Sequence, residues 1–311
     1  MSMGADTRGV YTIAPTPFEA DGRIDWASVD RMVDFYEACG VDGMTILGIM
    51  GEAPKLDAAE ALELVHRIVG RTRGPVVVGV SAPGFAAMRS LARAAMDAGA
   101  AAVMIAPPPS LRTDDQIAGY FRDASGAIGE DVPFVLQDYP LTLSVVMTPA
   151  VIRRIVGENP ACAMLKHEDW PGLEKITALR GFERDGSMRP ISILTGNGGL
   201  FLDLELARGA DGAMTGYAFP DMLVDLLGLS RAGEVDRAHD LFDIHLPYIR
   251  YEQQQGVGLA ARKHVLVRRG AIACDAQRKP GAALTDAARR EVDFLLGRIA
   301  AKDPREVVPI G

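Results

Sequence analysis

The sequence has few of the features that mark secreted, membrane or metal-binding proteins. Its 311 residues include only three cysteines, Cys39, Cys162 and Cys274. Because they are widely spaced and odd in number, they predict neither a disulfide framework nor a CxxC metal pair, and we expect a reducing, cytoplasmic location. No run of about 20 apolar residues is present, so no membrane-spanning helix is expected. Residues 1–9 lack the apolar stretch of a signal peptide.

Basic residues are fewer than acidic residues. Lys and Arg total 33 against 41 Asp and Glu, which gives a net charge of −8. Nucleic acids and anionic membranes are therefore not expected as partners. A small anionic substrate is not excluded, because a pocket can be locally positive. The five histidines are scattered and form no HExxH motif, so the sequence predicts no metal and no other cofactor.

The abundant feature is an alternation of short apolar runs with amphipathic helical stretches. Hydrophobic residues make up 48% of the chain, which is enough for a large core. The runs have the continuous apolar character of parallel strands that are covered on both faces. Eight strands are predicted, at residues 10–14, 43–47, 76–80, 101–105, 133–137, 161–166, 191–195 and 212–215.

The junctions between helices and strands repeat. A glycine follows a helical stretch and precedes a buried strand at Gly40, Gly99 and Gly209, as a left-handed helix cap requires. Asp57 and Glu60 form a predicted capping box at a helix start. Eight such units predict an α/β fold of the (β/α)8 TIM-barrel type. An open doubly wound sheet is the alternative, although no GxGxxG motif follows the first strand.

The pattern becomes wholly helical after residue 215. Four helices are predicted, at residues 221–231, 234–255, 258–269 and 286–300. One barrel unit needs only the first of these. We therefore predict a barrel over residues 1–228 and a C-terminal helical extension, packed on the barrel, over residues 229–311.

Lys166 is the first candidate for catalysis. It ends a buried apolar strand, and in such barrels the reactive groups lie at the carboxyl ends of strands. A lysine amine that is sheltered from water and uncharged part of the time attacks a carbonyl to form a Schiff base. The alternative is a strand-end lysine whose amine reaches solvent.

Three further loops at strand ends carry candidate residues. Gly48, Ile49, Met50 and Gly51 follow the second strand, and their backbone amides can bind a carboxylate. Gln137 and Tyr139 end the fifth strand, where a phenol can transfer protons. Gly196 and Asn197 follow the seventh strand, where backbone can lie close to a ligand, including a phosphate. Each loop is equally compatible with an ordinary turn. The residues concerned are Gly48, Ile49, Met50, Gly51, Gln137, Tyr139, Gly196 and Asn197.

The run His167-Glu168-Asp169 beside the lysine suggests a metal-dependent aldolase as one alternative. Three consecutive side chains do not readily converge on one ion. We therefore predict a solvated loop at these residues.

Together these segments resemble the dihydrodipicolinate synthase and N-acetylneuraminate lyase family of class I aldolases. The resemblance runs from about Thr12 to Gly216 and rests on five motifs in register. They are Thr16-Pro17-Phe18, Gly48 to Glu52, Leu165-Lys166, Thr195 to Gly198, and Gly209 to Thr215. The resemblance implies that Lys166 is the imine lysine and places Met214 among the substrate-binding residues.

Several positions depart from the family pattern. Ile49 and Met50 stand where hydroxyl side chains normally hold the substrate carboxylate, and Gln137 stands where the acid–base tyrosine is expected. Tyr139 lies two residues later and can supply a displaced phenol if the strand continues. The arginine that binds a second carboxylate in the synthase would fall near Thr142. These departures argue against dihydrodipicolinate synthase activity itself.

The resulting prediction is a Schiff-base-forming lyase, whether aldolase, hydratase-aldolase or dehydratase. Its expected substrate is a small 2-oxo acid such as pyruvate or a 2-keto-3-deoxy sugar acid. A family member that binds a 2-oxo acid without turnover is the alternative, because the hydroxyls of the second loop are missing. The resemblance also implies a homo-oligomer, a dimer or tetramer.

Overall fold

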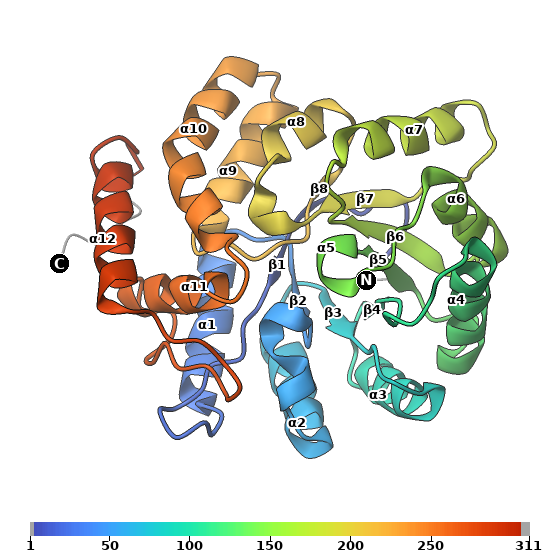
Figure 1. The fold of residues 1–311 in the computed structure, drawn as a ribbon, viewed down its shortest axis with the longest axis horizontal. Coiled ribbons are helices and arrows are strands. Elements are labelled where there is room, and N and C mark those ends of the chain that lie inside the picture. Colours follow the sequence, from blue (N-terminus) through green and yellow to red (C-terminus); the bar gives the residue numbers. More distant parts are fainter. Residues whose placement is uncertain (1–2, 306–311) are drawn as a thin grey trace.

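In the computed structural model, which describes residues 3–305, eight parallel strands close into a barrel in chain order (Figure 1). The predicted (β/α)8 barrel is confirmed, and the open sheet is wrong, because β8 pairs with β1. The strands are β1 Gly9–Ile13, β2 Gly43–Ile46, β3 Val76–Gly79, β4 Ala102–Ile105, β5 Phe134–Asp138, β6 Cys162–His167, β7 Ser192–Thr195 and β8 Gly212–Ala213.

Helices surround the barrel as an outer ring (Figure 1). Eight of them each follow one strand, and the short α5, Pro140–Leu143, precedes α6. The ring consists of α1 Trp26–Ala38, α2 Ala58–Arg71, α3 Phe85–Asp97, α4 Asp114–Ile128, α6 Pro149–Glu158, α7 Leu173–Arg184, α8 Leu202–Ala207 and α9 Pro220–Arg231. The Asp57–Glu60 capping box of α2 is present, and Gly40, Gly99 and Gly209 adopt positive φ, both as predicted.

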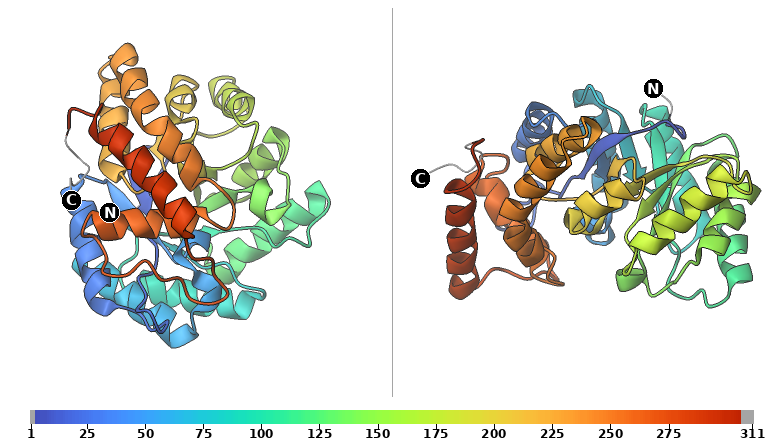
Figure 2. Two further views of the ribbon diagram at one scale, coloured as in Figure 1. Left: turned by 60° about the vertical axis from the view of Figure 1, so that its left-hand side comes forward. Right: turned by 90° about the horizontal axis from the view of Figure 1, so that it is seen from above.

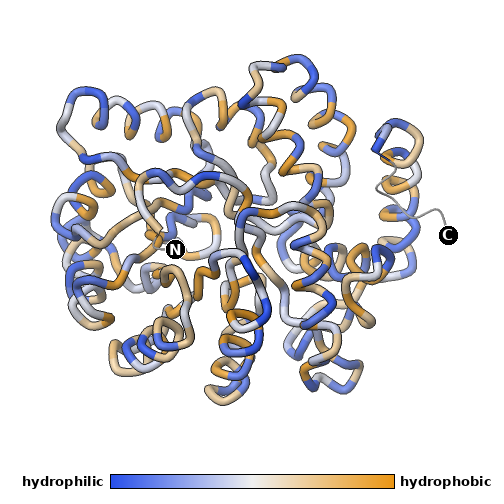
Figure 3. Tube along the Cα trace, turned by 180° about the vertical axis from the view of Figure 1, so that it is seen from behind, coloured by the Kyte–Doolittle hydropathy of each residue, from blue (hydrophilic) through white to orange (hydrophobic). Residues whose placement is uncertain are grey.

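Apolar side chains fill both sides of the sheet. One cluster occupies the barrel interior and includes Ile13, Met164 and Met214. A larger cluster lies between the strands and the surrounding helices. Hydrophobic and hydrophilic residues alternate along the helices, as expected for helices that pack one face on the barrel and expose the other to solvent (Figure 3). Strand residues therefore alternate between the interior and the helices, and this alternation decides which side chains reach the barrel mouth.

Three helices form the C-terminal extension, α10 Val235–Glu252, α11 Gly258–Arg268 and α12 Asp286–Ala300. They stand at one side of the barrel, and α12 is the outermost (Figure 2). Their apolar side chains share a core with β1, β8 and α9, in which Val10, Leu223 and Val265 take part. The predicted boundary at residue 228 lies inside α9, so dividing the chain there stays a prediction.

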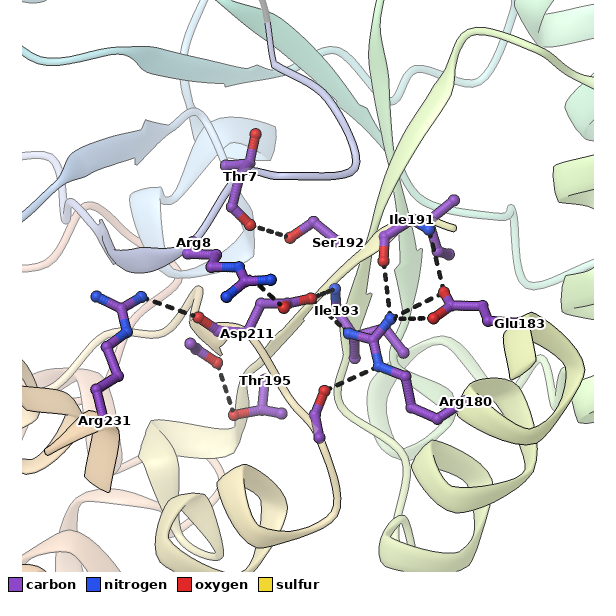
Figure 4. Close-up of polar contacts among 12 residues, drawn as sticks. Thr7, Arg8, Arg180, Glu183, Ile191, Ser192, Ile193, Thr195, Asp211 and Arg231 are labelled. Atoms are coloured by element: carbon purple, nitrogen blue, oxygen red, sulfur yellow. Dashed lines mark hydrogen bonds and ion pairs between the residues drawn. The ribbon is translucent and has the colours of Figure 1, made fainter. Parts of the chain in front are cut away.

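At the amino-terminal ends of β7 and β8, away from the mouth of the barrel, side chains and backbone groups form a polar network (Figure 4). The Arg180 guanidinium pairs with Asp211 and donates to the Ile191 carbonyl at 3.0 Å. The Asp211 carboxylate accepts the Ile193 amide at 2.9 Å, and Ser192 Oγ donates to the Thr7 carbonyl at 2.7 Å. These contacts hold the short β8 in place, and such a stabilising role is typical of this face of a barrel. Within residues 3–305, no helix is long and apolar enough to cross a membrane.

Candidate active site

Lys166 projects into the mouth of the barrel. It pairs in register with Gln137 of β5 and Leu194 of β7, and it lies on the same face of β6 as the interior residue Met164. Only 5% of Lys166 is exposed, and its Nζ lies 2.8 Å from Oε1 of Glu168. The amine is therefore enclosed and paired, and it does not reach out to solvent as the alternative interpretation proposed.

Glu168 is the second charged group of the site. Its Oε1 also accepts a hydrogen bond from Nε2 of Gln137 at 2.8 Å, and its carbonyl accepts one from Nδ2 of Asn197 at 2.9 Å. A Cβ at Gly196 would lie 2.2 Å from the Glu168 side chain, so only glycine leaves room for it. Residues from β5, β6 and the loop after β7 thus converge on Glu168.

The prediction of a solvated loop at residues 167–169 is wrong. β6 continues through His167, which is fully buried, and Glu168 is 6% exposed. His167 faces the helices, with Nδ1 at 3.7 Å from Asp138 Oδ2, while Asp169 pairs with Lys175 at 2.5 Å. Strand alternation sends the three side chains in different directions. Residues 3–305 contain no group of three or more His, Cys, Asp or Glu side chains placed to hold a metal ion.

Tyr139 supplies a phenol at the same cavity. β5 extends to Asp138, one residue beyond its predicted end, so Gln137 and Tyr139 face the cavity while Asp138 faces Lys175. Burial raises the pKa of Tyr139, and the nearby Glu168 carboxylate acts in the same direction. The phenol is therefore protonated near neutral pH and acts as a hydrogen-bond and proton donor.

The loop after β2 forms the opposite wall. Ile49–Gly51 is a single 3-10 turn, in which the Gly51 amide bonds to the Gly48 carbonyl at 3.0 Å. The first amides of a helical turn have no acceptor within the turn, so those of Ile49 and Met50 are suited to an anion. The carbonyl of Gly51 accepts from Oγ1 of Thr16 at 2.6 Å, which fixes the loop to the segment after β1.

These groups line a small cavity of about 40 Å³. Six of the predicted site residues line this cavity, namely Lys166, Gln137, Tyr139, Ile49, Met50 and Asn197. Its remaining lining consists of Ile13, Glu168, Gly198, Thr215, Gly216, Gln253 and Arg262.

Four predicted residues lie outside this lining. Gly48 and Gly51 shape the 3-10 turn, and Gly196 makes room for Glu168. Met214 belongs to the apolar filling of the barrel and is fully buried. Sequence reasoning missed Glu168, although its position two residues after Lys166 was a usable signal. It also missed Gln253 and Arg262, which come from the extension and carry no local signal.

Comparisons with known proteins identify the family of the chain. A family model described as the dihydrodipicolinate synthetase family matches residues 6–299. An L-2-keto-3-deoxyarabonate dehydratase from Azospirillum brasilense is 31% identical over 298 residues, which cover 94% of each chain. A 4-hydroxy-tetrahydrodipicolinate synthase from Pseudomonas aeruginosa is 27% identical over 236 residues, 75% of this chain and 78% of the other.

Solved structures of related proteins have the same fold. A dihydrodipicolinate synthase from Rhodopseudomonas palustris has 68% sequence identity and a TM-score of 0.95, covering 96% of this chain and 99% of the other. YagE of E. coli K12, described in complex with pyruvate, has 22% identity and a TM-score of 0.84, covering 94% and 98%. At that identity YagE supports the fold alone.

Proposed function

The chain belongs to the dihydrodipicolinate synthetase family and is a lyase of the class I aldolase type, and from this premise we propose that it dehydrates a 2-keto-3-deoxy sugar acid through a Schiff base on Lys166. The observation that carries the proposal is the 2.8 Å contact between Lys166 Nζ and Glu168 Oε1 inside the cavity that Tyr139 also lines. Nucleophile, carboxylate and phenol lie around one small space.

Schiff-base formation is the first step. The Lys166 amine gives a proton to Glu168 and adds to the C2 carbonyl of the 2-oxo acid. The carbonyl oxygen then takes one proton from the nitrogen and the proton held by Glu168, and it leaves as water, which returns Glu168 to its carboxylate form. Burial of the pair keeps competing water away from the imine. In the proposed arrangement, the Ile49 and Met50 amides bind the substrate carboxylate.

Loss of water is the second step. The imine draws electrons from C3, so the Glu168 carboxylate removes a C3 proton and an enamine forms. The enamine electrons return toward C3 and C4, the C4–O bond breaks, and the departing hydroxyl takes a proton from Tyr139. Glu168 then passes its proton back to Tyr139, and water hydrolyses the imine, which releases the product and the free Lys166 amine. The water taken up here equals the water lost when the imine formed, so the net reaction is loss of one water and no oxidant is needed. Gln137 holds Glu168 in position by its hydrogen bond at 2.8 Å.

Two observations favour dehydration over other reactions of the imine. The first is the extra carboxylate of Glu168 beside the lysine, which supplies a base for the C3 proton. The second is the identity of 31% over 94% of each chain with a relative named as a 2-keto-3-deoxyarabonate dehydratase. Aldol cleavage uses the same groups, but it breaks the C3–C4 bond and releases pyruvate with an aldehyde.

Synthase activity is a second candidate. It is favoured by the 68% identity with a protein described as dihydrodipicolinate synthase. The name of the synthase product, a dipicolinate, indicates two carboxylates, so this reaction needs a second anion-binding group. Thr142 does not supply one, because it carries no charge.

Product analysis separates these reactions. Purified protein is incubated with L-2-keto-3-deoxyarabonate, and products are followed by NMR and mass spectrometry. The proposal predicts loss of one water without pyruvate release, and Lys166→Ala abolishes it. Release of pyruvate would indicate aldol cleavage. Imine trapping without any turnover would favour a family member that binds a 2-oxo acid but does not convert it.

We also propose a homo-oligomer. Phe294 of α12 and Val235 of α10 are 64% and 56% exposed, so the extension presents apolar side chains for assembly. Light scattering at micromolar concentration should give a dimer or tetramer mass. A monomer mass would contradict this expectation.

A further inference from the structure

An arginine of the C-terminal extension reaches the cavity of the barrel. Arg262 lies on α11, far from Lys166 in the sequence, yet both side chains line the same space. Only 2% of Arg262 is exposed, although a guanidinium is charged at every physiological pH. A buried charge needs partners, so the surroundings of this group show what it can bind.

One part of the guanidinium is already bound. Nε donates to Oε1 of Glu252 at 2.5 Å, and Glu252 also accepts the Ala218 amide at 3.2 Å. This ion pair neutralises Arg262 and holds its plane in one orientation. Glu252 is 2% exposed, so the pair is shielded from solvent at both ends.

The other part has no partner. Nη1 is fully buried and makes no hydrogen bond to any residue within 3–305. Leaving a buried, charged donor unpaired is costly, so Nη1 calls for a hydrogen-bond acceptor. A ligand oxygen in the adjoining cavity would satisfy it.

The backbone after β8 is shaped to let the guanidinium through. A Cβ at Gly216 would lie 1.7 Å from Nη1 of Arg262, so any other residue at this position would push the guanidinium away. Gly216 and Gly198 both line the cavity, and Gln253 from the end of α10 lies beside Gly198. Two glycines and two polar side chains therefore form the wall on the β7–β8 side.

We infer that Arg262 binds the distal end of the substrate, donating from Nη1 to a hydroxyl or carboxylate oxygen on the tail of the 2-oxo acid. The inference rests on the proposed imine at Lys166, and it assigns Arg262 the selection of acids with an oxygen-bearing tail over pyruvate. The substrate carboxylate is assigned to the loop after β2, which lies opposite β6 in the barrel order, and the β7–β8 wall carries the unpaired donor that a tail oxygen would meet.

Trapping with borohydride tests this without requiring turnover. Half-saturation of the Lys166 adduct is measured for three acids, namely pyruvate, which has no tail, 2-oxoglutarate, which has a tail carboxylate, and L-2-keto-3-deoxyarabonate, which has tail hydroxyls. Arg262→Lys should raise half-saturation about 10- to 100-fold for at least one tailed acid, because it removes a charge-assisted hydrogen bond. The value for pyruvate should change by less than about 2-fold.

Two further variants separate binding from folding. Gly216→Ala displaces the guanidinium without removing it, and it should give the same selective loss. Arg269→Lys is the matched control, because Arg269 lies at the carboxyl end of the same helix and pairs with Asp221 at 2.8 Å but does not line the cavity. It should leave all three values unchanged, and melting temperatures show which variants are folded.

The outcomes distinguish this inference from the proposed function. Suppose that the wild-type protein traps pyruvate at Lys166 and that the folded Arg262 and Gly216 variants change the half-saturation values of all three acids by the same factor. Arg262 then has only a structural role and the inference fails. If no acid is trapped at Lys166, both the proposed function and the inference fail. A tail preference carried by carboxylate points to a dicarboxylate substrate, and one carried by hydroxyls points to a sugar acid.

Discussion

Glu168 lies two residues beyond Lys166 on the same side of the chain, and its Oε1 is 2.8 Å from the lysine Nζ. Both side chains are almost fully buried, so this pair is not a surface ion pair that salt would screen. A nucleophile and a base in direct contact suggest a carboxylate that takes the amine proton and then acts on the bound substrate.

The first prediction concerns that carboxylate. Glu168→Gln keeps the shape and the contact to Gln137 but removes the base, so kcat for dehydration should fall about 10²- to 10⁴-fold. Trapping of pyruvate at Lys166 should remain detectable. Glu174→Gln, at an exposed side chain of α7, is the matched control and should retain full activity. Unchanged turnover in Glu168→Gln would remove Glu168 from the mechanism.

The second prediction concerns the phenol. Tyr139→Phe removes the proton donor to the leaving hydroxyl, so kcat should fall about 10²-fold or more, with a small change in KM. Tyr120→Phe is the control, because Tyr120 is a partly buried tyrosine whose OH donates to the Ala106 carbonyl away from the cavity. Equal kinetics for the two variants would show that Tyr139 is not the acid.

The third prediction tests how Glu168 is positioned. Gly196→Ala places a Cβ where the Glu168 side chain lies, at 2.2 Å, so the carboxylate must move away from Lys166. Turnover should fall at least 10-fold in a protein that still folds. Gly70→Ala, in α2 with open space around the added Cβ, should leave turnover unchanged. A fully active Gly196→Ala variant would show that the observed Glu168 position is not needed.

The fourth prediction concerns stability against pH. Burial raises the pKa of Glu205 from 4.5 to about 7, so between these pH values the folded protein holds a proton that the unfolded chain has released. The contribution of Glu205 to the free energy of unfolding is therefore largest below pH 4.5 and declines as pH rises to about 7. The decline should total at most about 3 kcal/mol.

Glu205→Gln removes this titration. Urea unfolding from pH 5 to pH 8 should give the variant a flatter stability curve than the wild type, with the two curves diverging as pH rises. Glu174→Gln again serves as the control, because an exposed carboxyl contributes little to the free energy of unfolding. Parallel curves for wild type and Glu205→Gln would contradict the raised pKa.

The barrel was predictable because its signals are local and repeated. Buried parallel strands need continuous apolar runs, and left-handed caps need glycine, as at Gly40 and Gly99. Lys166 followed from its place at a strand end. The ends of β5 and β6 were less certain, because each strand continues one residue beyond its predicted end, through Asp138 and His167.

The rest of the site depends on contacts that no local pattern encodes. A run of His, Glu and Asp is typical of a solvated loop, and only the continuation of β6 turns Glu168 toward Lys166. Arg262 lies 96 positions after Lys166 and enters the site through the packing of α11 on the barrel. Gly216, which makes room for it, cannot be distinguished in the sequence from an ordinary turn glycine.

The most direct measurement is borohydride reduction in the presence of pyruvate, followed by peptide mapping of the modified residue. The structure places the enclosed Lys166 amine beside its base, so one adduct should form, it should map to Lys166, and Lys166→Ala should form none. An adduct on another lysine, or no adduct with any 2-oxo acid, would contradict the assignment of this chain's chemistry to Lys166.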